Sequence, residues 1–442
     1  MNILVIGNGF DLAHGLPTKY MHFLFFCYAV KRLIKDNKIG EKIPREDEDR
    51  FNWLNGDEML VFSDILKEDS YLFDFYSYKH SMSDRERKVY IEMLDDFIAN
   101  LFLSEDTDFK LGKEIVLLVF ENFWIEYFLQ CDMHGDENWI DFESEIANVI
   151  KAIEKKMHGS DKTYSLYDEI ADWPDKLNTS FRLYFEKKYG KQVTYKLVRD
   201  KLSRDLDKLI RLFEIYLTEY VNRIYVEIFS PDIKEIVKCS CVKNGIKTHL
   251  YSKVLSFNYT DTYEREYWEE GEYIRTCGEY MDYIHGEAGN SDARGYNNMV
   301  LGIDESLGRK KRNKYVEFIA FKKFYQRIHK QTDSRYKKWV DLIREDLQRE
   351  KTWIYENKDY FKDKFYNLFF FGHSLDITDR DILRDLILND NVHTTIFYHN
   401  KEVMGQQIAN LVKVIGEDQL IRRTGGSTKT IEFKQQQPME PK

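Results

Sequence analysis

The sequence predicts an α/β fold in which a Rossmann-type parallel sheet carries large α-helical insertions. Residues 2–6 form a short apolar run that ends in a glycine, which is typical of a strand buried on both faces. Comparable runs return only after residue 253, and most of the intervening sequence has helical periodicity. Short buried strands separated by helices are typical of a parallel sheet that is covered on both sides. The first strand must therefore pair with strands that follow the long helical stretch.

The composition predicts a soluble globular protein. Hydrophobic residues make up 43% of the 442-residue chain and charged residues 32%. Lys and Arg number 66 against 76 Asp and Glu, and the resulting net charge of −10 argues against nucleic-acid binding. The five cysteines form no CxxC pair, so we expect free thiols in a reducing cytoplasm and no metal site. The longest apolar run, around residues 23–30, is too short to span a membrane.

The order of the predicted elements divides the chain into a discontinuous sheet domain and helical insertions. The clearest helix runs from Leu206 to Ile228, with apolar residues at three- and four-residue steps and Pro231 as its stop. Predicted strands occupy residues 253–257, 282–286, 299–303, 366–374 and 393–400. We expect the sheet domain at 1–26 and 250–423, a helical insertion at 27–249, a second helical insertion at 308–362, and a disordered tail at 424–442.

The unusual residues of this sequence follow the predicted strands. In an open parallel sheet, ligands bind beyond the carboxyl ends of the strands, so we expect these residues to share one edge. They are Gly7, Asn8, Gly9, Phe10 and Asp11 after the first strand, Asn258 and His285 after later ones, and Gly372, His373 and Ser374 after another.

The Gly7-Asn8-Gly9 turn has two interpretations. Glycine permits a close approach of a phosphate to the backbone, but the same pattern also suits a tight turn between a strand and a helix. A third glycine of a dinucleotide-binding motif would stand at position 12, where the chain has Leu12. Asp11 would repel a phosphate, but it suits a ribose hydroxyl, a capping role or the orientation of a water. By itself, Asn258 is more often a turn former than a catalytic group.

Residues 138–146, NWIDFESEI, have helical periodicity, with Trp139 on the apolar stripe. A helix that packs on the sheet domain is the preferred interpretation. The alternative places Asp141 or Glu143 over the strand ends, as part of a lid that the insertion contributes.

Six blocks of the sequence resemble the AbiH-type phage abortive infection family. They are VIGNGFDLAHGLPTKYMHF at 5–23, NWIDFESEI at 138–146, SFNYTDT at 256–262, YIHGE at 283–287, MVLGIDE at 299–305 and FFGHSLDITDRDIL at 370–383. The resemblance extends from residue 2 to about residue 400 and implies an anti-phage function.

AbiH proteins in turn resemble the nucleotide-binding domain of sirtuins, which binds NAD and breaks its nicotinamide–ribose bond. The resemblance implies a sirtuin-like sheet domain in which Asn258 and His285 are catalytic. It also implies that residues 7–11 and 372–374, together with Asp376, bind the nucleotide. The zinc-binding cysteine pairs of sirtuin deacylases have no counterpart in this chain, so deacylation is not expected.

We therefore expect a cytoplasmic NAD hydrolase of phage defence that uses no metal. One alternative is a nucleotide sensor or adaptor without turnover. Another is a metal-dependent hydrolase or nuclease that uses Asp11, Asp141 and Glu143. The expected partners are NAD or a related nucleotide and a phage-derived trigger or another defence protein. The sequence leaves open whether the chain forms a homo-oligomer.

Overall fold

The fold is known from a computed structural model of the 442-residue chain. The structure describes residues 1–35, 92–103, 109–120, 122–130, 141–156, 163–165, 184–185, 192–237, 240–243, 246–249, 253–268, 280–290, 297–303, 316–332, 334–353 and 366–442. Trp139 lies outside the described residues.

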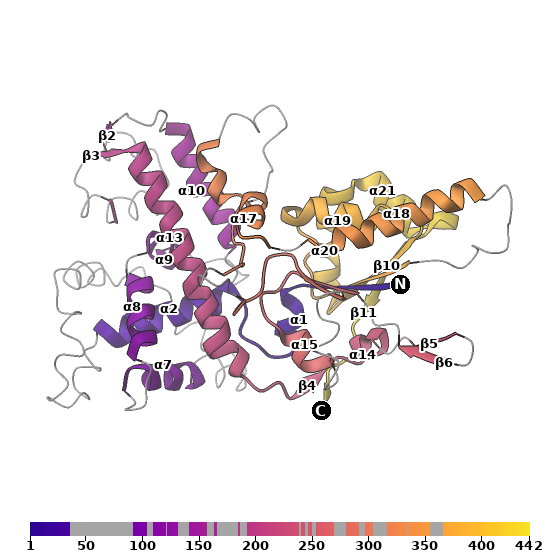
Figure 1. The fold of residues 1–442 in the computed structure, drawn as a ribbon, viewed down its shortest axis with the longest axis horizontal. Coiled ribbons are helices and arrows are strands. Elements are labelled where there is room, and N and C mark those ends of the chain that lie inside the picture. The colour runs from indigo at the N-terminus through magenta and orange to yellow at the C-terminus, as the bar shows by residue number, and fades with distance from the viewer. Residues whose placement is uncertain are drawn as a thin grey trace.

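A six-stranded parallel sheet forms one half of the molecule (Figure 1). Its strand order is β11-β10-β9-β1-β7-β8. The strands are β1 (Asn2–Ile6), β7 (Lys253–Ser256), β8 (Met281–Tyr283), β9 (Tyr366–Phe371), β10 (Val392–Tyr398) and β11 (Ile431–Gln435). The first strand of the chain is thus central, with β7 on one side and β9 on the other. The prediction of a parallel α/β fold is confirmed.

Alternate side chains of β1 enter two different cores, because successive residues of a strand point to opposite faces. Ile3 and Val5 pack in a core with residues of α18 (Tyr336–Trp353), α19 (Arg380–Ile387), α20 (Lys401–Ile415) and α21 (Glu417–Thr424). Leu4 and Ile6 pack in the other core with Phe10 of α1 (Asn8–Ala13) and with residues of α14 (Pro231–Val237) and α15 (Thr262–Tyr267). Helices therefore cover both faces of the sheet, which explains the wholly apolar sequence of β1.

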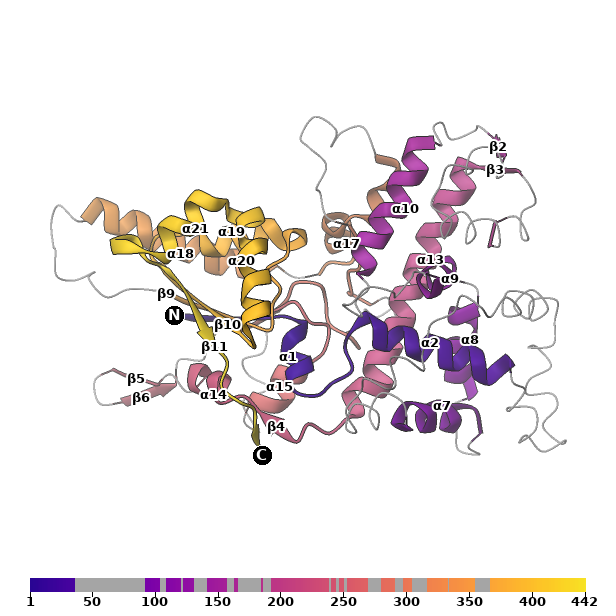
Figure 2. The ribbon, with the colours of Figure 1, turned by 180° about the vertical axis from the view of Figure 1, so that it is seen from behind.

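A separate helical lobe stands beside the sheet and has its own core (Figures 1 and 2). Its helices are α2 (Tyr20–Lys35), α7 (Met93–Leu103), α8 (Phe109–Phe120), α9 (Phe123–Gln130), α10 (Phe142–Lys156) and α13 (Tyr195–Ile215). A short helix from the second insertion, α17 (Lys323–His329), lies beside α10 in both views. The 3-10 helix Val316–Phe321 precedes α17.

Three two-stranded sheets complete the described part of the chain. Their strands are β2 (Thr163–Ser165) with β3 (Gln192–Thr194), β5 (Ser240–Lys243) with β6 (Ile246–His249), and β4 (Ile228–Phe229) with β12 (Glu440–Pro441). All three pairs are antiparallel. No described helix has both the length and the apolar character needed to cross a membrane.

Two predicted elements differ in the structure. The helix expected from Leu206 to Ile228 is α13 only to Ile215, after which it becomes a π-helix (Tyr216–Tyr220) and then a 3-10 turn (Val221–Arg223). The strand expected at 299–303 is not in the sheet. The side chain of Gln326 bonds both the amide and the carbonyl of Leu301, so a side chain replaces a neighbouring strand there.

The tail is not disordered, contrary to the prediction. Residues 431–435 form β11, which pairs with β10 along its length. The buried guanidinium of Arg423 donates to the carbonyls of Leu388 and Asn389 and to the hydroxyl of Thr430. Composition does not reveal these contacts, which depend on one residue. Arg423 satisfies the carbonyl groups at the end of α19 and fixes the residue that precedes β11.

Candidate functional site

The ends of four neighbouring strands lie side by side at one edge of the sheet. The amide of Gly7 donates to the carbonyl of Phe371 at 3.1 Å, which joins the end of β1 to the end of β9. On the other side, the amide of Phe257 donates to Ile6 and that of Ile284 donates to Ser256, both at 2.9 Å. The polar residues that follow these strands therefore start from the same edge, as expected for parallel strands.

The two glycine turns pack directly against each other. The amide of Gly9 donates to the carbonyl of Gly372 at 2.8 Å, and Gly372 has a φ of +66°. A Cβ on Gly9 would lie 2.8 Å from the Cα of Gly372, and one on Gly372 would lie 2.1 Å from the amide nitrogen of Phe10. The amides of Gly7, Gly9 and Phe10 all donate to backbone carbonyls already. Glycine is thus required at both positions because the two loops are in contact, and a side chain at either one would clash with the backbone of the other.

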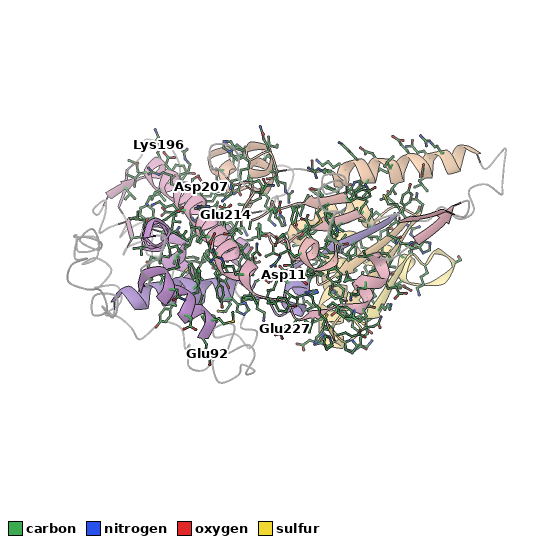
Figure 3. All side chains as sticks on the ribbon, turned by 60° about the horizontal axis from the view of Figure 1, so that its bottom comes forward. Asp11, Glu92, Lys196, Asp207, Glu214 and Glu227 are labelled. Atoms are coloured by element: carbon green, nitrogen blue, oxygen red, sulfur yellow. The ribbon has the colours of Figure 1, made fainter. Side chains whose placement is uncertain are left out.

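Asp11 is buried between the sheet and the helical lobe (Figure 3). Its Oδ2 accepts a hydrogen bond of 2.6 Å from the hydroxyl of Thr260, which in turn accepts one from Thr262. Burial raises the pKa of Asp11 to about 7, although hydrogen bonds from the two threonines oppose the rise. Its other oxygen, Oδ1, has no hydrogen-bond partner among the residues that the structure describes. A carboxyl group with such a pKa can exchange a proton near neutral pH.

Asn258 shares this environment and is only 5% exposed. Its carboxamide is near enough to Asp11 to help hold down the pKa of that carboxyl. In the part of the chain that the structure describes, no group meets hydrogen-bond geometry with the oxygen or the nitrogen of the carboxamide, and its approach to Asp11 is looser than a hydrogen bond. The backbone amide is bonded to the hydroxyl of Ser256. A buried polar group without a partner costs about 1–3 kcal/mol. A water or a ligand hydroxyl would satisfy both Asn258 and Asp11.

His285 faces a different set of groups. Its Nε2 lies 3.4 Å from Oδ1 of Asp379, and its Nδ1 lies 3.4 Å from the guanidinium of Arg327. The rings of Phe257 and Tyr259 lie 5.4 and 6.2 Å from the imidazole. Burial, reinforced by the charge of a nearby lysine, lowers the pKa of His285 to about 3. His285 is therefore a neutral imidazole at physiological pH.

His373 lies near the carboxylate of Asp379, as His285 does. Its Nε2 lies 3.8 Å from Oδ2 of Asp379, and its Nδ1 accepts a hydrogen bond of 2.9 Å from the amide of Leu375. Burial lowers the pKa of His373 as well. Leu375 has a φ of +58° although it is not a glycine, so the loop is strained at this point.

Two helical segments bring an ion pair to the same carboxylate. Nζ of Lys323, the first residue of α17, lies 2.7 Å from Oε2 of Glu143 in α10 and 3.6 Å from Oδ1 of Asp379. Burial opposes ionisation of Asp379, but Lys323 and the two imidazoles outweigh it and hold its pKa well below the usual range. Burial raises the pKa of Glu143 to about 7, although Lys323 opposes the rise.

The remaining predicted residues have mainly structural contacts. Asp141 caps α10, because its Oδ1 accepts from the amide of Glu143 at 3.0 Å. Asp376 caps a 3-10 turn (Ile377–Asp379) by accepting from the amide of Thr378. The ring of Phe10 is buried in the core. Ser374 has an exposed side chain, while Asn8 is half-buried at the start of α1.

The structure thus gathers the predicted residues into two groups. Asn258 lies near Asp11. His285 and His373 both face Asp379, which Lys323 connects to Glu143. The missed residues are Asp379, Lys323 and Arg327. Asp379 stands three residues after Asp376 in a block already noted, but Lys323 and Arg327 carry no local signal. Within the described ranges, no group of three or more His, Cys, Asp and Glu side chains is arranged to hold a metal ion.

Comparison with known proteins places these features in one family. A family model described as bacteriophage abortive infection AbiH matches residues 3–399, which is most of the chain. No curated protein matches the sequence, and no solved structure matches the fold.

Proposed function

The chain belongs to the bacteriophage abortive infection AbiH family, and from this premise we propose that it is an anti-phage effector that binds NAD and hydrolyses the nicotinamide–ribose bond. The family match supports the role in abortive infection. The choice of NAD is supported by the strand-end motifs around Asn258, His285 and Gly372, which resemble those of sirtuins.

The observation that carries the proposal is the pair of buried, unsatisfied polar groups at Asp11 and Asn258. Both lie after strands that adjoin at the centre of the sheet, where β7 and β9 flank β1. An open α/β sheet binds its ligand where the strand order reverses, which here is between β1 and β9, so Asp11 follows a strand at this point and Asn258 follows the next strand along. By standard hydrogen-bond geometry, one oxygen of Asp11 and the whole carboxamide of Asn258 lack partners among the described residues. These groups are suited to holding a water or a ribose hydroxyl.

The nicotinamide of NAD is a good leaving group because it is already cationic while it is attached to ribose. Hydrolysis then needs a water placed against C1′ and stabilisation of an oxocarbenium-like transition state. We assign Asn258 to orient this water and Asp11, as carboxylate, to accept its proton. The water oxygen bonds to C1′, and the electrons of the broken C1′–N bond neutralise the nicotinamide ring. We assign His285 to accept a hydrogen bond from a ribose hydroxyl.

The two glycine turns would contribute to nucleotide binding through side chains. The amides of Gly7 and Gly9 already donate to carbonyls, so they are not free to hold the pyrophosphate. Asn8 and Ser374 are the polar side chains on these turns, and we assign them to the pyrophosphate and the adjacent ribose. Asp376 stabilises the turn that follows Ser374.

The test is mass spectrometry of a nucleotide mixture after incubation with the purified chain, with and without a lysate of phage-infected cells. We expect loss of NAD and equal amounts of nicotinamide and ADP-ribose. The Asn258→Ala variant should lower the rate by roughly 10²–10⁴, the range for a group that acts on the transition state. Asn400→Ala is the matched control, because Asn400 is exposed and caps α20. Intact NAD under both conditions would overturn the proposed reaction.

Two arms of this experiment address the alternatives. Full activity in EDTA is expected; loss of activity that Mg²⁺ or Mn²⁺ restores would instead favour the metal-dependent hydrolase. The aromatic rings of Phe257 and Tyr259 against His285 favour a second candidate, a nucleotide sensor, because rings can bind a base without chemistry. Equilibrium dialysis that shows bound and fully recoverable NAD would support the sensor.

A further inference from the structure

Asp379 is the meeting point of three segments that are far apart in the sequence. One oxygen faces Nε2 of His285 at 3.4 Å and Nζ of Lys323 at 3.6 Å. The other faces Nε2 of His373 at 3.8 Å. The two histidines follow β8 and β9, and Lys323 begins a helix of the second insertion. One carboxylate therefore faces two imidazoles and an ammonium group, all of them buried. Among the described residues Oδ1 of Asp379 has no partner that meets hydrogen-bond geometry, so these are contacts between charged and polar groups at 3.4–3.8 Å.

The remaining contacts of the two imidazoles fix where their protons are. Nδ1 of His285 faces the guanidinium of Arg327, which can only donate, so this nitrogen carries no proton in the neutral ring. Nδ1 of His373 accepts from the backbone amide of Leu375, so it carries none either. Both rings must then carry their proton on Nε2, the nitrogen that faces Asp379.

We propose that Asp379 is a positioning residue whose negative charge orients His285 and His373 in the tautomer that their Nδ1 contacts set, and that Lys323, itself held by Glu143, keeps Asp379 ionised. This inference rests on the proposed function, because Nδ1 of His285 is the acceptor assigned to the ribose hydroxyl, which on binding must take the place of the Arg327 guanidinium that now lies 3.4 Å from this nitrogen. It also makes the site composite. Glu143 comes from the helical lobe and Lys323 from the second insertion, so both must be docked for Asp379 to be held.

The charges around His285 are consistent with this arrangement. Asp379 approaches from the 3-10 turn, Lys323 and Arg327 approach from α17, and Phe257 and Tyr259 supply uncharged rings. Glu143 offsets the lysine at 2.7 Å. The two cations disfavour a third positive charge on the ring, and the low pKa of His285 agrees with a neutral imidazole.

The test is nitrogen NMR of the full chain labelled with ¹⁵N-histidine, with assignments from His285→Gln and His373→Gln. In the unsubstituted protein we expect both rings to be Nε2–H tautomers at neutral pH, and His285 not to titrate between pH 5 and 8. An Nδ1–H tautomer of either ring, or titration of His285 within this range, would overturn the proposal. This measurement needs no variant at Asp379, so a contrary result counts even if such a variant does not fold.

Asp379→Asn should remove the negative charge that faces both Nε2 atoms, so that the Nε2 resonance of at least one ring shifts while both Nδ1 atoms stay unprotonated. Asp381→Asn is the matched control, since Asp381 is an exposed acid of the first turn of α19. If NAD turnover is present, Asp379→Asn should lower kcat by roughly 10²-fold with little change in KM, at the lower end for an acid–base group. Unchanged Nε2 resonances of both rings, or unchanged kcat, in a folded Asp379→Asn protein would refute the role. If the unsubstituted protein shows no NAD turnover, the proposed reaction fails while the ring resonances of Asp379→Asn still test Asp379.

Discussion

Replacing Gly9 with alanine tests whether the contact between the two glycine turns holds the edge of the sheet together. The added Cβ would lie 2.8 Å from both the Cα and the carbonyl oxygen of Gly372. These are backbone atoms, so the contact can be relieved only if the two turns separate. The separation would also break the 2.8 Å hydrogen bond from the Gly9 amide to that oxygen.

The change in the free energy of unfolding combines two losses, the overpacking and the broken hydrogen bond, with one gain in helix propensity. Overpacking costs about 1–3 kcal/mol, and the hydrogen bond contributes about 1 kcal/mol. The substitution also stabilises the protein by up to about 1 kcal/mol, because Gly9 lies in helix α1 and alanine favours a helix more than glycine does. The net loss should therefore be about 1–3 kcal/mol of the free energy of unfolding.

Gly405→Ala is the matched control, because Gly405 lies within helix α20 and a Cβ there would meet no atom within 4 Å. We expect this variant to be stabilised by about 0.5–1 kcal/mol. Gly372→Ala should be the least stable of the three. Its Cβ would lie 2.1 Å from Phe10, and its φ of +66° costs a further 1–2 kcal/mol or so in alanine.

The assay is thermal unfolding of the three variants, followed by circular dichroism. For a chain of this length, 1 kcal/mol corresponds to roughly 1–2 °C in Tm, extrapolated from smaller domains. Gly9→Ala should thus melt roughly 2–8 °C below Gly405→Ala. If Gly9→Ala melts at or above Gly405→Ala, the two turns do not depend on their close contact, and the glycines must be explained by a ligand.

Three further predictions concern the site and the tail. Asn258→Ala and His285→Ala should each abolish phage protection in cells at normal expression, and the double variant should be little worse, because effects on one transition state are not additive; full protection by either single variant would contradict the assignment. Asp11 has a folded-state pKa of about 7 against 3.8 when unfolded, so its contribution to stability is present below about pH 4 and is lost as the pH rises through 7. The Tm of Asp11→Asn should therefore rise relative to the unsubstituted protein between pH 4 and 8, and a constant difference would refute the shift. Ending the chain at residue 429 should remove β11, lower stability by at least about 2 kcal/mol through loss of buried Ile431, and cause association through the bare edge of β10, which size-exclusion chromatography would detect.

The sequence by itself determined the class of fold and the edge at which the candidate site lies. The apolar run at 3–6, which is short and closed by a glycine, predicts a strand buried on both faces, since no polar residue interrupts it. Parallel strands deliver their ends to one edge, so the polar residues after these strands had to start close together. Both conclusions depend on local pattern alone, and the structure bears them out.

Only the tertiary structure decided which groups meet at that edge. Glu143, Lys323 and Asp379 lie in three different segments, and no local pattern relates them, because an ion pair between insertions depends on how the helices dock. The same holds for the tail, where Arg423 orders a strand that composition predicts to be disordered. It holds as well for Gly9, whose missing Cβ is explained by Gly372, a residue that comes near it only after the sheet has formed.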